Sequence, residues 1–192
     1  MEDFNNLENA TVDDLKAIAK GQAEIASKVG DHLIAHLSLL KGDFGGFPID
    51  RYDHCLQAAT RAYNDKRSAE YVVCALFHDI GDTLAPYNHA EVIAEILRPF
   101  IDDRNHFILQ QHGVFQGYYF WGKLGLDRNA RDQYRDSPYF NDTVEFCEKY
   151  DSPAFDRNYP NLPIETFRPL IDEVLKAPKQ ASVYSAIFAK TK

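Results

Sequence analysis

The chain has few cysteines and no long hydrophobic run. Its three cysteines, Cys55, Cys74 and Cys147, are odd in number and widely spaced, which is typical of buried or free thiols in a reducing compartment. No apolar stretch approaches the roughly 18 residues that span a bilayer. The acidic, polar start MEDFNNLEN lacks the features of a signal peptide. We therefore expect a cytoplasmic protein that does not enter a membrane.

Basic residues are also few relative to acidic ones. The chain has 21 Lys and Arg against 29 Asp and Glu, which gives a formal net charge of -8. A broad basic face that binds nucleic acid is therefore not expected. A small pocket can still be basic inside an acidic protein, so a small anionic ligand remains compatible with this charge.

The sequence lacks alternating polar and apolar segments, internal repeats and low-complexity stretches. Apolar residues recur instead at helical spacing, which predicts an all-α bundle of about seven to nine helices. With 192 residues, 45% of them hydrophobic, we expect a single domain over residues 1–192. The predicted helices cover residues 11–40 with a break near Gly30, 50–64, 68–81 with Gly81 as a left-handed cap, 88–99, 103–120, 137–150 with Ser137 as cap, and 163–175. Residues 41–48 are predicted to form a loop, and residues 177–192 are ambiguous.

Histidines and carboxylates form an ordered series in the middle of the chain. Neighbouring helical residues differ by about 100° in direction, so His78 can bind one metal ion while the two oxygens of Asp79 reach between two ions. Imidazole and carboxylate together suit iron and manganese, and the paired-cysteine motif of structural zinc is absent. The predicted metal ligands, each at or near a helix end, are His54, His78, Asp79, His89, His112 and Asp151.

Other residues compete for these roles. Asp156 is the alternative to Asp151 as the last ligand, and Asp151 is favoured because it directly follows a predicted helix. His106 lies six residues before His112 and so points to another face of the helix, which indicates a structural or an exposed position. His32 and His36 have the i,i+4 spacing of a metal pair, but their mostly apolar helix indicates packing.

The series H…HD…H…H…D, with HDIG at residues 78–81, resembles the HD-domain superfamily over about residues 44–157. The segments NHAEVIAEILRPF (88–100) and SPYFNDTVEFCEKYDSPAFD (137–156) are most similar to the phosphonate branch of the HD-domain mixed-valent diiron oxygenases. The resemblance implies an HD-domain helical bundle with two iron ions, Fe(II)/Fe(III). One ion would be held by His54, His78, Asp79 and Asp151, and the other by His89, His112 and the bridging ligand Asp79.

The resemblance also implies a substrate. The family members use O2 to cleave the carbon–phosphorus bond of a 1-hydroxy-2-ammonioethylphosphonate. Where aminoethylphosphonate enzymes carry a tyrosine and a glutamate in a loop before the first histidine, this chain has Phe44-Gly45-Gly46-Phe47. A trimethylammonium group has no N–H to donate and is attracted to aromatic rings. We therefore expect the trimethylammonio substrate, which would give glycine betaine and phosphate.

Two further departures concern the substrate pocket. Asp82 stands where aminoethylphosphonate enzymes have a histidine, and Gln116 where the family has a basic residue. The residues predicted to contact the substrate are Phe44, Phe47, Asp82, Gln116, Tyr119 and Lys149. Other basic residues that could bind the phosphonate are Lys123, Arg128, Arg131, Arg135 and Arg157.

Three other functions share this ligand set. One is a dinuclear HD-domain phosphohydrolase acting on a nucleotide or a small phosphate ester. Another is an oxygenase acting on a polyol, similar to myo-inositol oxygenase. The third is a binding module without catalysis, in which metal stabilises the fold. The oligomeric state is left open.

Overall fold

The computed structural model describes residues 4–179, and within that range it contains helices and turns but no strand. The α-helices are α1 (Val12–Ala26), α2 (Val29–Leu37), α3 (Arg51–Asn64), α4 (Ala69–Phe77), α5 (His89–Leu97), α6 (Asp103–Gln116), α7 (Phe140–Phe146) and α8 (Ile164–Val174). The all-α prediction is confirmed for this part of the chain. Most of the ambiguous tail, residues 180–192, lies outside it. None of these helices is both long and apolar enough to cross a membrane.

Side-chain caps explain where several helices begin. Thr11 accepts a hydrogen bond from the backbone of Asp14, whose carboxylate accepts in turn from the backbone of Thr11. This capping box satisfies backbone donors that have no partner inside the helix. The side chains that cap α3, α4 and α6 are those of Asp50, Ser68 and Asp102.

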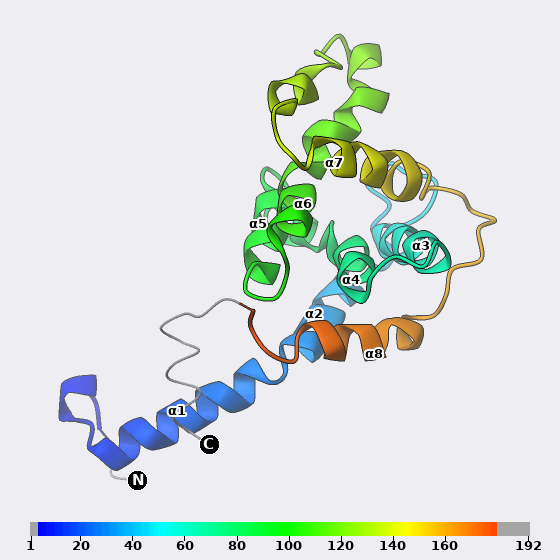
Figure 1. Cartoon of the computed structure of the whole chain (residues 1–192). Coiled ribbons are helices and arrows are strands. Elements are labelled where there is room, and N and C mark those ends of the chain that lie inside the picture. The colour runs from blue at the N-terminus through cyan, green and yellow to red at the C-terminus, as the bar shows by residue number, and fades with distance from the viewer. Residues whose placement is uncertain (1–3, 180–192) are drawn as a thin grey trace.

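Helix α4 is the centre of the bundle. It is apolar on every side, and its residues from Tyr71 to Phe77 are all buried, as expected for a helix surrounded by others. Helix α3 packs on α4, α4 on α8, α5 on α6 and α6 on α7. Helix α1 extends away from this body (Figure 1). The C-terminal end of α4, where His78 and Asp79 follow, therefore lies among α3, α5 and α6.

The structure adjusts one predicted helix boundary and corrects another. The break predicted near Gly30 is present and lies at Ser27–Lys28. Helix α4 ends at Phe77, and Gly81 belongs to a 3-10 turn without a positive φ. A glycine is needed at residue 81 because the turn after α4 approaches the start of α5 closely. A Cβ atom at Gly81 would lie 2.5 Å from the carbonyl oxygen of His89.

The helices predicted over residues 103–120 and 137–150 are shorter in the structure. Helix α6 ends at Gln116 because the chain tightens into 3-10 turns, with the Trp121 ring packed directly against Gly117. Helix α7 begins at Phe140, since Ser137 caps a preceding turn by accepting from the backbone of Tyr139 at 3.2 Å. After Phe146 the helix widens into a π-helical turn, Cys147–Asp151.

Candidate metal centre

The structure brings the six predicted ligands together from five separate elements. His54 lies in the first turn of α3, His78 and Asp79 follow α4, His89 begins α5, His112 lies near the end of α6, and Asp151 ends the π-helical turn after α7. His54, His78, Asp79, His112 and Asp151 form a buried cluster that could hold a metal ion.

One group of donor atoms surrounds a single point. The Nε2 atoms of His54 and His78 lie 3.1 Å apart. Oδ2 of Asp79 lies 3.4 Å from each of these nitrogens. Oδ1 of Asp151 lies 3.3 Å from Nε2 of His54 and 3.6 Å from Nε2 of His78. Four donor atoms from three elements thus face one another.

A second group uses the other oxygen of Asp79. The Nε2 atoms of His89 and His112 are 3.3 Å apart. Oδ1 of Asp79 lies 3.5 Å from Nε2 of His89 and 3.2 Å from Nε2 of His112. The carboxylate of Asp79 therefore has one oxygen in each group.

These separations fit metal coordination. Ligands bound at about 2.1 Å lie about 3.0 Å apart at right angles and about 3.4 Å apart at the tetrahedral angle. The imidazoles are also oriented for it, because Nδ1 of His54, His78 and His112 lies 2.7–2.9 Å from a backbone carbonyl oxygen. A carbonyl oxygen can only accept, so each Nδ1 carries the proton and each Nε2 presents a lone pair to the cluster.

The fourth imidazole is held by a carboxylate instead. Nδ1 of His89 lies 3.1 Å from Oδ1 of Asp82. In each pair of histidines, the two Nε2 atoms face each other. Two facing lone pairs repel unless a cation or a proton lies between them. In addition, the buried Oδ2 atom of Asp151 has no hydrogen-bond partner among the described residues. The residues present therefore fit bound cations.

The buried ionisable groups shift one another's pKa. Burial lowers the pKa of His54, but its contacts with Asp151 and Asp79 outweigh this and raise it to about 9. Burial raises the pKa of Asp79, yet the charge of His78 and the hydrogen bonds of His112 and His54 hold it well below its usual range. Burial lowers the pKa of His89, which favours the neutral, ion-binding form. Cations can take the place of the protons that otherwise balance these carboxylates.

Exposure differs sharply around the cluster. The side chains of His54, His78 and Asp151 are at most 2% exposed, whereas that of His89 is 25% exposed. Asp82 and Arg51 are also partly exposed, at 13% and 18%. The cluster is therefore closed around His54, His78 and Asp151 and is more open at His89, Asp82 and Arg51.

No protein-family model matches the chain, and no curated protein matches its sequence. The resemblance to the HD-domain oxygenases therefore stays a proposal that rests on the motif and on the arrangement of these ligands.

The predicted substrate residues divide into those near the cluster and those away from it. Nε2 of Gln116 donates to Oδ1 of Asp151 at 2.7 Å, and Asp82 contacts His89. Tyr119 is half-buried and packs against the hydrophobic core. Lys149 is exposed and its ammonium lies 2.8 Å from Glu145, so the structure does not bring Lys149 to the cluster.

The loop that carries Phe44 and Phe47 reaches the cluster through Phe155, a residue that the sequence alone did not indicate. The ring of Phe47 stacks on that of Phe155, with centroids 4.7 Å apart, and Phe155 stacks on His54 at 4.2 Å. Phe44 is half exposed. A second missed residue is Arg51, whose Nη2 atom lies 2.7 Å from Oδ2 of Asp79. Its position one turn before His54 on the same helix was the available signal.

The competing residues lie elsewhere. Nε2 of His106 lies 2.9 Å from a carboxylate oxygen of Glu95, in agreement with the structural role expected for it. His36 contacts Thr83 at 2.7 Å. His32 is exposed, so the prediction that it packs in the core was wrong. The carboxylate of Asp156 accepts from the backbone of Asn158.

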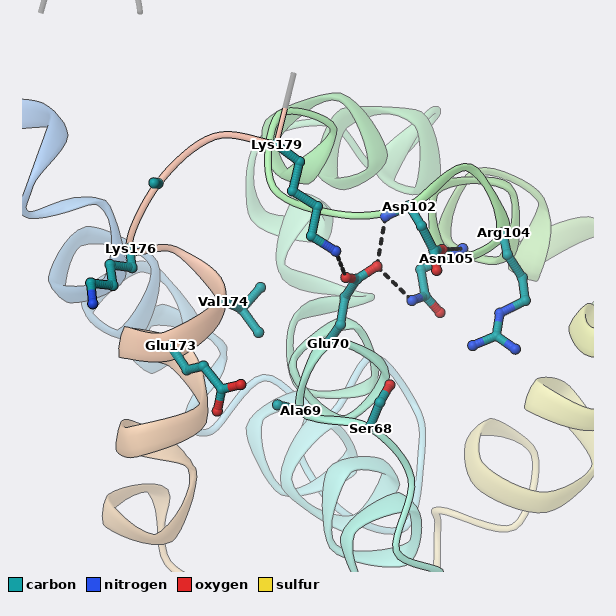
Figure 2. Close-up of a pocket in the computed structure, with 11 residues that line it drawn as sticks. Ser68, Ala69, Glu70, Asp102, Arg104, Asn105, Glu173, Val174, Lys176 and Lys179 are labelled. Carbon is teal, nitrogen blue, oxygen red and sulfur yellow. Dashed lines mark hydrogen bonds and ion pairs between the residues drawn. The ribbon is translucent and has the colours of Figure 1, made fainter. Parts of the chain in front are cut away.

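A cavity of about 610 Å³ lies at the opposite end of α4, between the starts of α4 and α6 and the end of α8 (Figure 2). Its central acid, Glu70, accepts hydrogen bonds from Asp102 and Asn105 and pairs with Lys179. The cavity contains none of the predicted ligands, and Glu70 is already satisfied. We therefore place the functional site at the histidine–aspartate cluster.

Proposed function

We propose that the cluster holds two iron ions and that Asp79 bridges them. The observation that carries this proposal is the position of the two oxygens of Asp79: Oδ2 faces His54 and His78, while Oδ1 faces His89 and His112. Each oxygen of Asp79 thus faces its own pair of imidazoles, which supports two ions with Asp79 between them. Iron is favoured because four imidazoles and two carboxylates suit it and because of the resemblance to the diiron oxygenases.

The proposed reaction is oxidative cleavage of a carbon–phosphorus bond. The substrate is a 1-hydroxy-2-ammonioethylphosphonate, in its trimethylammonio form, and the products are glycine betaine and phosphate. The C–H and C–P bonds of the carbinol carbon break, and one atom of O2 enters the carboxylate while the other enters the phosphate. These two bonds supply the electrons that reduce O2, so no other reductant is required. When bound, the iron supplies Lewis acidity and exchanges electrons with O2.

The chain's own residues hold the metal ligands in place and exclude water from them. The carbonyl acceptors of His54, His78 and His112 fix the imidazoles with their lone pairs inward, and burial of these ligands keeps bulk water from the closed side. At the open side, Phe47 offers an aromatic ring 5.5 Å from the guanidinium of Arg51, and Asp82 offers a carboxylate. Rings and a diffuse negative charge attract a quaternary ammonium group, which supports the trimethylammonio form.

A dinuclear phosphohydrolase is the second candidate. The observation that favours it is Arg51, a guanidinium beside the bridging carboxylate, because this group matches phosphoryl oxygens geometrically. In that reaction two ions would activate water and neutralise the phosphoryl group. The two candidates thus share the metal ligands and differ in their need for O2.

The deciding experiment combines metal analysis with oxygen uptake. Protein purified without added metal should contain about two irons per chain, give a mixed-valent EPR signal, and release phosphate from 1-hydroxy-2-(trimethylammonio)ethylphosphonate only with O2. The His89→Ala variant should lose one ion and all turnover. The control His32→Ala, at an exposed residue, should keep two ions and full turnover. Phosphatase activity with Mn(II) and no oxygen uptake would favour the phosphohydrolase. Turnover of a polyol alone would indicate a polyol oxygenase, and metal without any turnover a binding module.

A further inference from the structure

Arg51 is a charged side chain that the fold places at the open edge of the metal cluster. Both of its ion pairs, with Asp79 and with Asp82, are made through the single atom Nη2. Its Nε atom is buried and has no hydrogen-bond partner among the described residues. A guanidinium has five N–H donors, so the donors on Nε and Nη1 are left for another acceptor.

A glycine lies beside one of those donors. A Cβ atom added to Gly45 would lie 3.7 Å from Nη1, in ordinary van der Waals contact, so a larger side chain there would crowd this side of the guanidinium. Gly45 has a φ of +51°, a conformation that favours glycine over other residues. The guanidinium also lies 5.5 Å from the ring centroid of Phe47, which limits how far it can swing towards that loop.

Arg51 is close enough to act together with the metal ligands. Oδ2 of Asp79 lies 2.7 Å from Nη2 of Arg51 and 3.4 Å from the Nε2 atoms of His54 and His78. Cations at the cluster would draw the charge of Asp79 to themselves and so weaken its pairing with Arg51. The guanidinium would then carry more uncompensated charge at the more exposed edge of the cluster.

We propose that Arg51 and the metal ions together bind a tetrahedral phosphorus oxyanion, with the guanidinium donating in bidentate fashion to two of its oxygens. A guanidinium fork fits such an anion better than a single ammonium. The assignment rests on the proposed metal centre and names the class of group that enters it. It applies to a phosphonate and to free phosphate alike, and it does not depend on whether O2 is used.

Binding to the metal-loaded protein tests this without turnover. Methylphosphonate and inorganic phosphate are titrated separately and anaerobically, with the metal content and spectrum measured alongside. Arg51→Gln should keep both ions but weaken binding of both probes by about tenfold or more, and Arg51→Lys should weaken it less. Arg168→Gln, a change at an exposed arginine of α8, should bind like the wild type. Unchanged binding in Arg51→Gln with both ions present would overturn the proposal.

A second measurement uses the wild-type protein and so does not depend on the variants folding. The metal-loaded chain is treated with phenylglyoxal, an arginine reagent, with and without phosphate, and modified sites are identified by mass spectrometry. Phosphate should protect Arg51 and leave Arg168 equally modified. Equal modification of Arg51 in both samples would reject the assignment. Protection by phosphate without oxygen uptake on the phosphonate would keep the assignment and reject the oxygenase.

Discussion

Gln116 and Asp151 are joined by a hydrogen bond of 2.7 Å from Nε2 to Oδ1. The same Oδ1 lies 3.3 Å from Nε2 of His54, so Gln116 fixes an oxygen that faces the cluster. The other side-chain atom of Gln116, Oε1, is buried without a partner among the described residues. A neutral amide at this position therefore orients Asp151 without adding charge beside it.

Gln116→Glu places a second carboxylate against Asp151. We expect it to lower the free energy of unfolding of the metal-free protein by about 1–3 kcal/mol, because like charges are buried together and a hydrogen bond is lost. Added metal should recover part of this loss. Urea unfolding with and without metal measures it. Gln133→Glu is the control, since that amide is exposed and bonds only to the carbonyl of Ala130; equal stability of both variants would contradict the role of Gln116.

The Asp79→Asn variant tests whether Asp79 is needed for binding of two metal ions. An amide has only one oxygen that can bind a cation, and its NH2 group repels one. We therefore expect the metal content to fall from about two ions per chain to one or fewer, with the fold retained. Elemental analysis of the purified variant provides the measurement. Asp142→Asn, which changes an acid paired with Arg104 at 3.8 Å, should leave the metal content unchanged. Two ions in Asp79→Asn would rule out the bridge.

Gly81→Ala tests the contact between the turn after α4 and the start of α5. The added Cβ would lie 2.5 Å from the carbonyl oxygen and 2.8 Å from the Cα of His89, so the backbone that carries His89 must move. We expect a loss of roughly 1–3 kcal/mol of stability and weaker binding of the ion held by His89. Gly21→Ala should instead add up to about 1 kcal/mol, because nothing crowds that helical position. Thermal unfolding and metal analysis of both variants would show whether the two changes differ in sign.

Phe155→Leu removes the flat ring that stacks on His54 at an interplanar angle of 14°. Leucine keeps apolar volume but cannot hold the imidazole plane, so His54 should lose orientation. We expect faster release of metal to a chelator and a loss of about 0.5–1.5 kcal/mol of stability. Phe120→Leu, at a half-exposed ring that packs beside Trp121, should release metal at the wild-type rate. Identical release from both variants would show that the stack does not position His54.

Much of the site could be predicted because its signal is local. His78 and Asp79 follow an apolar helix, and His89 follows Asn88 at a helix start, so residue type and helix ends sufficed to place them. The order of the ligands along the chain, together with the family resemblance, indicated the rest. Helix positions were predicted from apolar spacing, and the residues at the predicted starts 11, 50 and 68 are the ones that cap α1, α3 and α4.

Contacts between distant segments could not be predicted in the same way. The stack of Phe155 on His54 joins residues about one hundred positions apart, and the role of Gly81 depends on where α5 happens to begin. Arg51 was overlooked because an arginine on a polar helix face is usually solvated. The end of α6 was misplaced because the packing of Trp121 against Gly117 overrides helix propensity.

The π-helical turn that carries Asp151 sets the direction of its side chain. The backbone N–H of Ser152 bonds to the carbonyl of Cys147, five residues earlier, so this turn holds one residue more than an α-helical turn. If the same residues were wound as a regular α-helix, Asp151 would be carried further around the helix axis and its carboxylate would point away from His54. In this segment the winding of the backbone matters as much as the identity of the residues: a change that made the turn regular at the same length would disconnect the last ligand even if every ligand were retained.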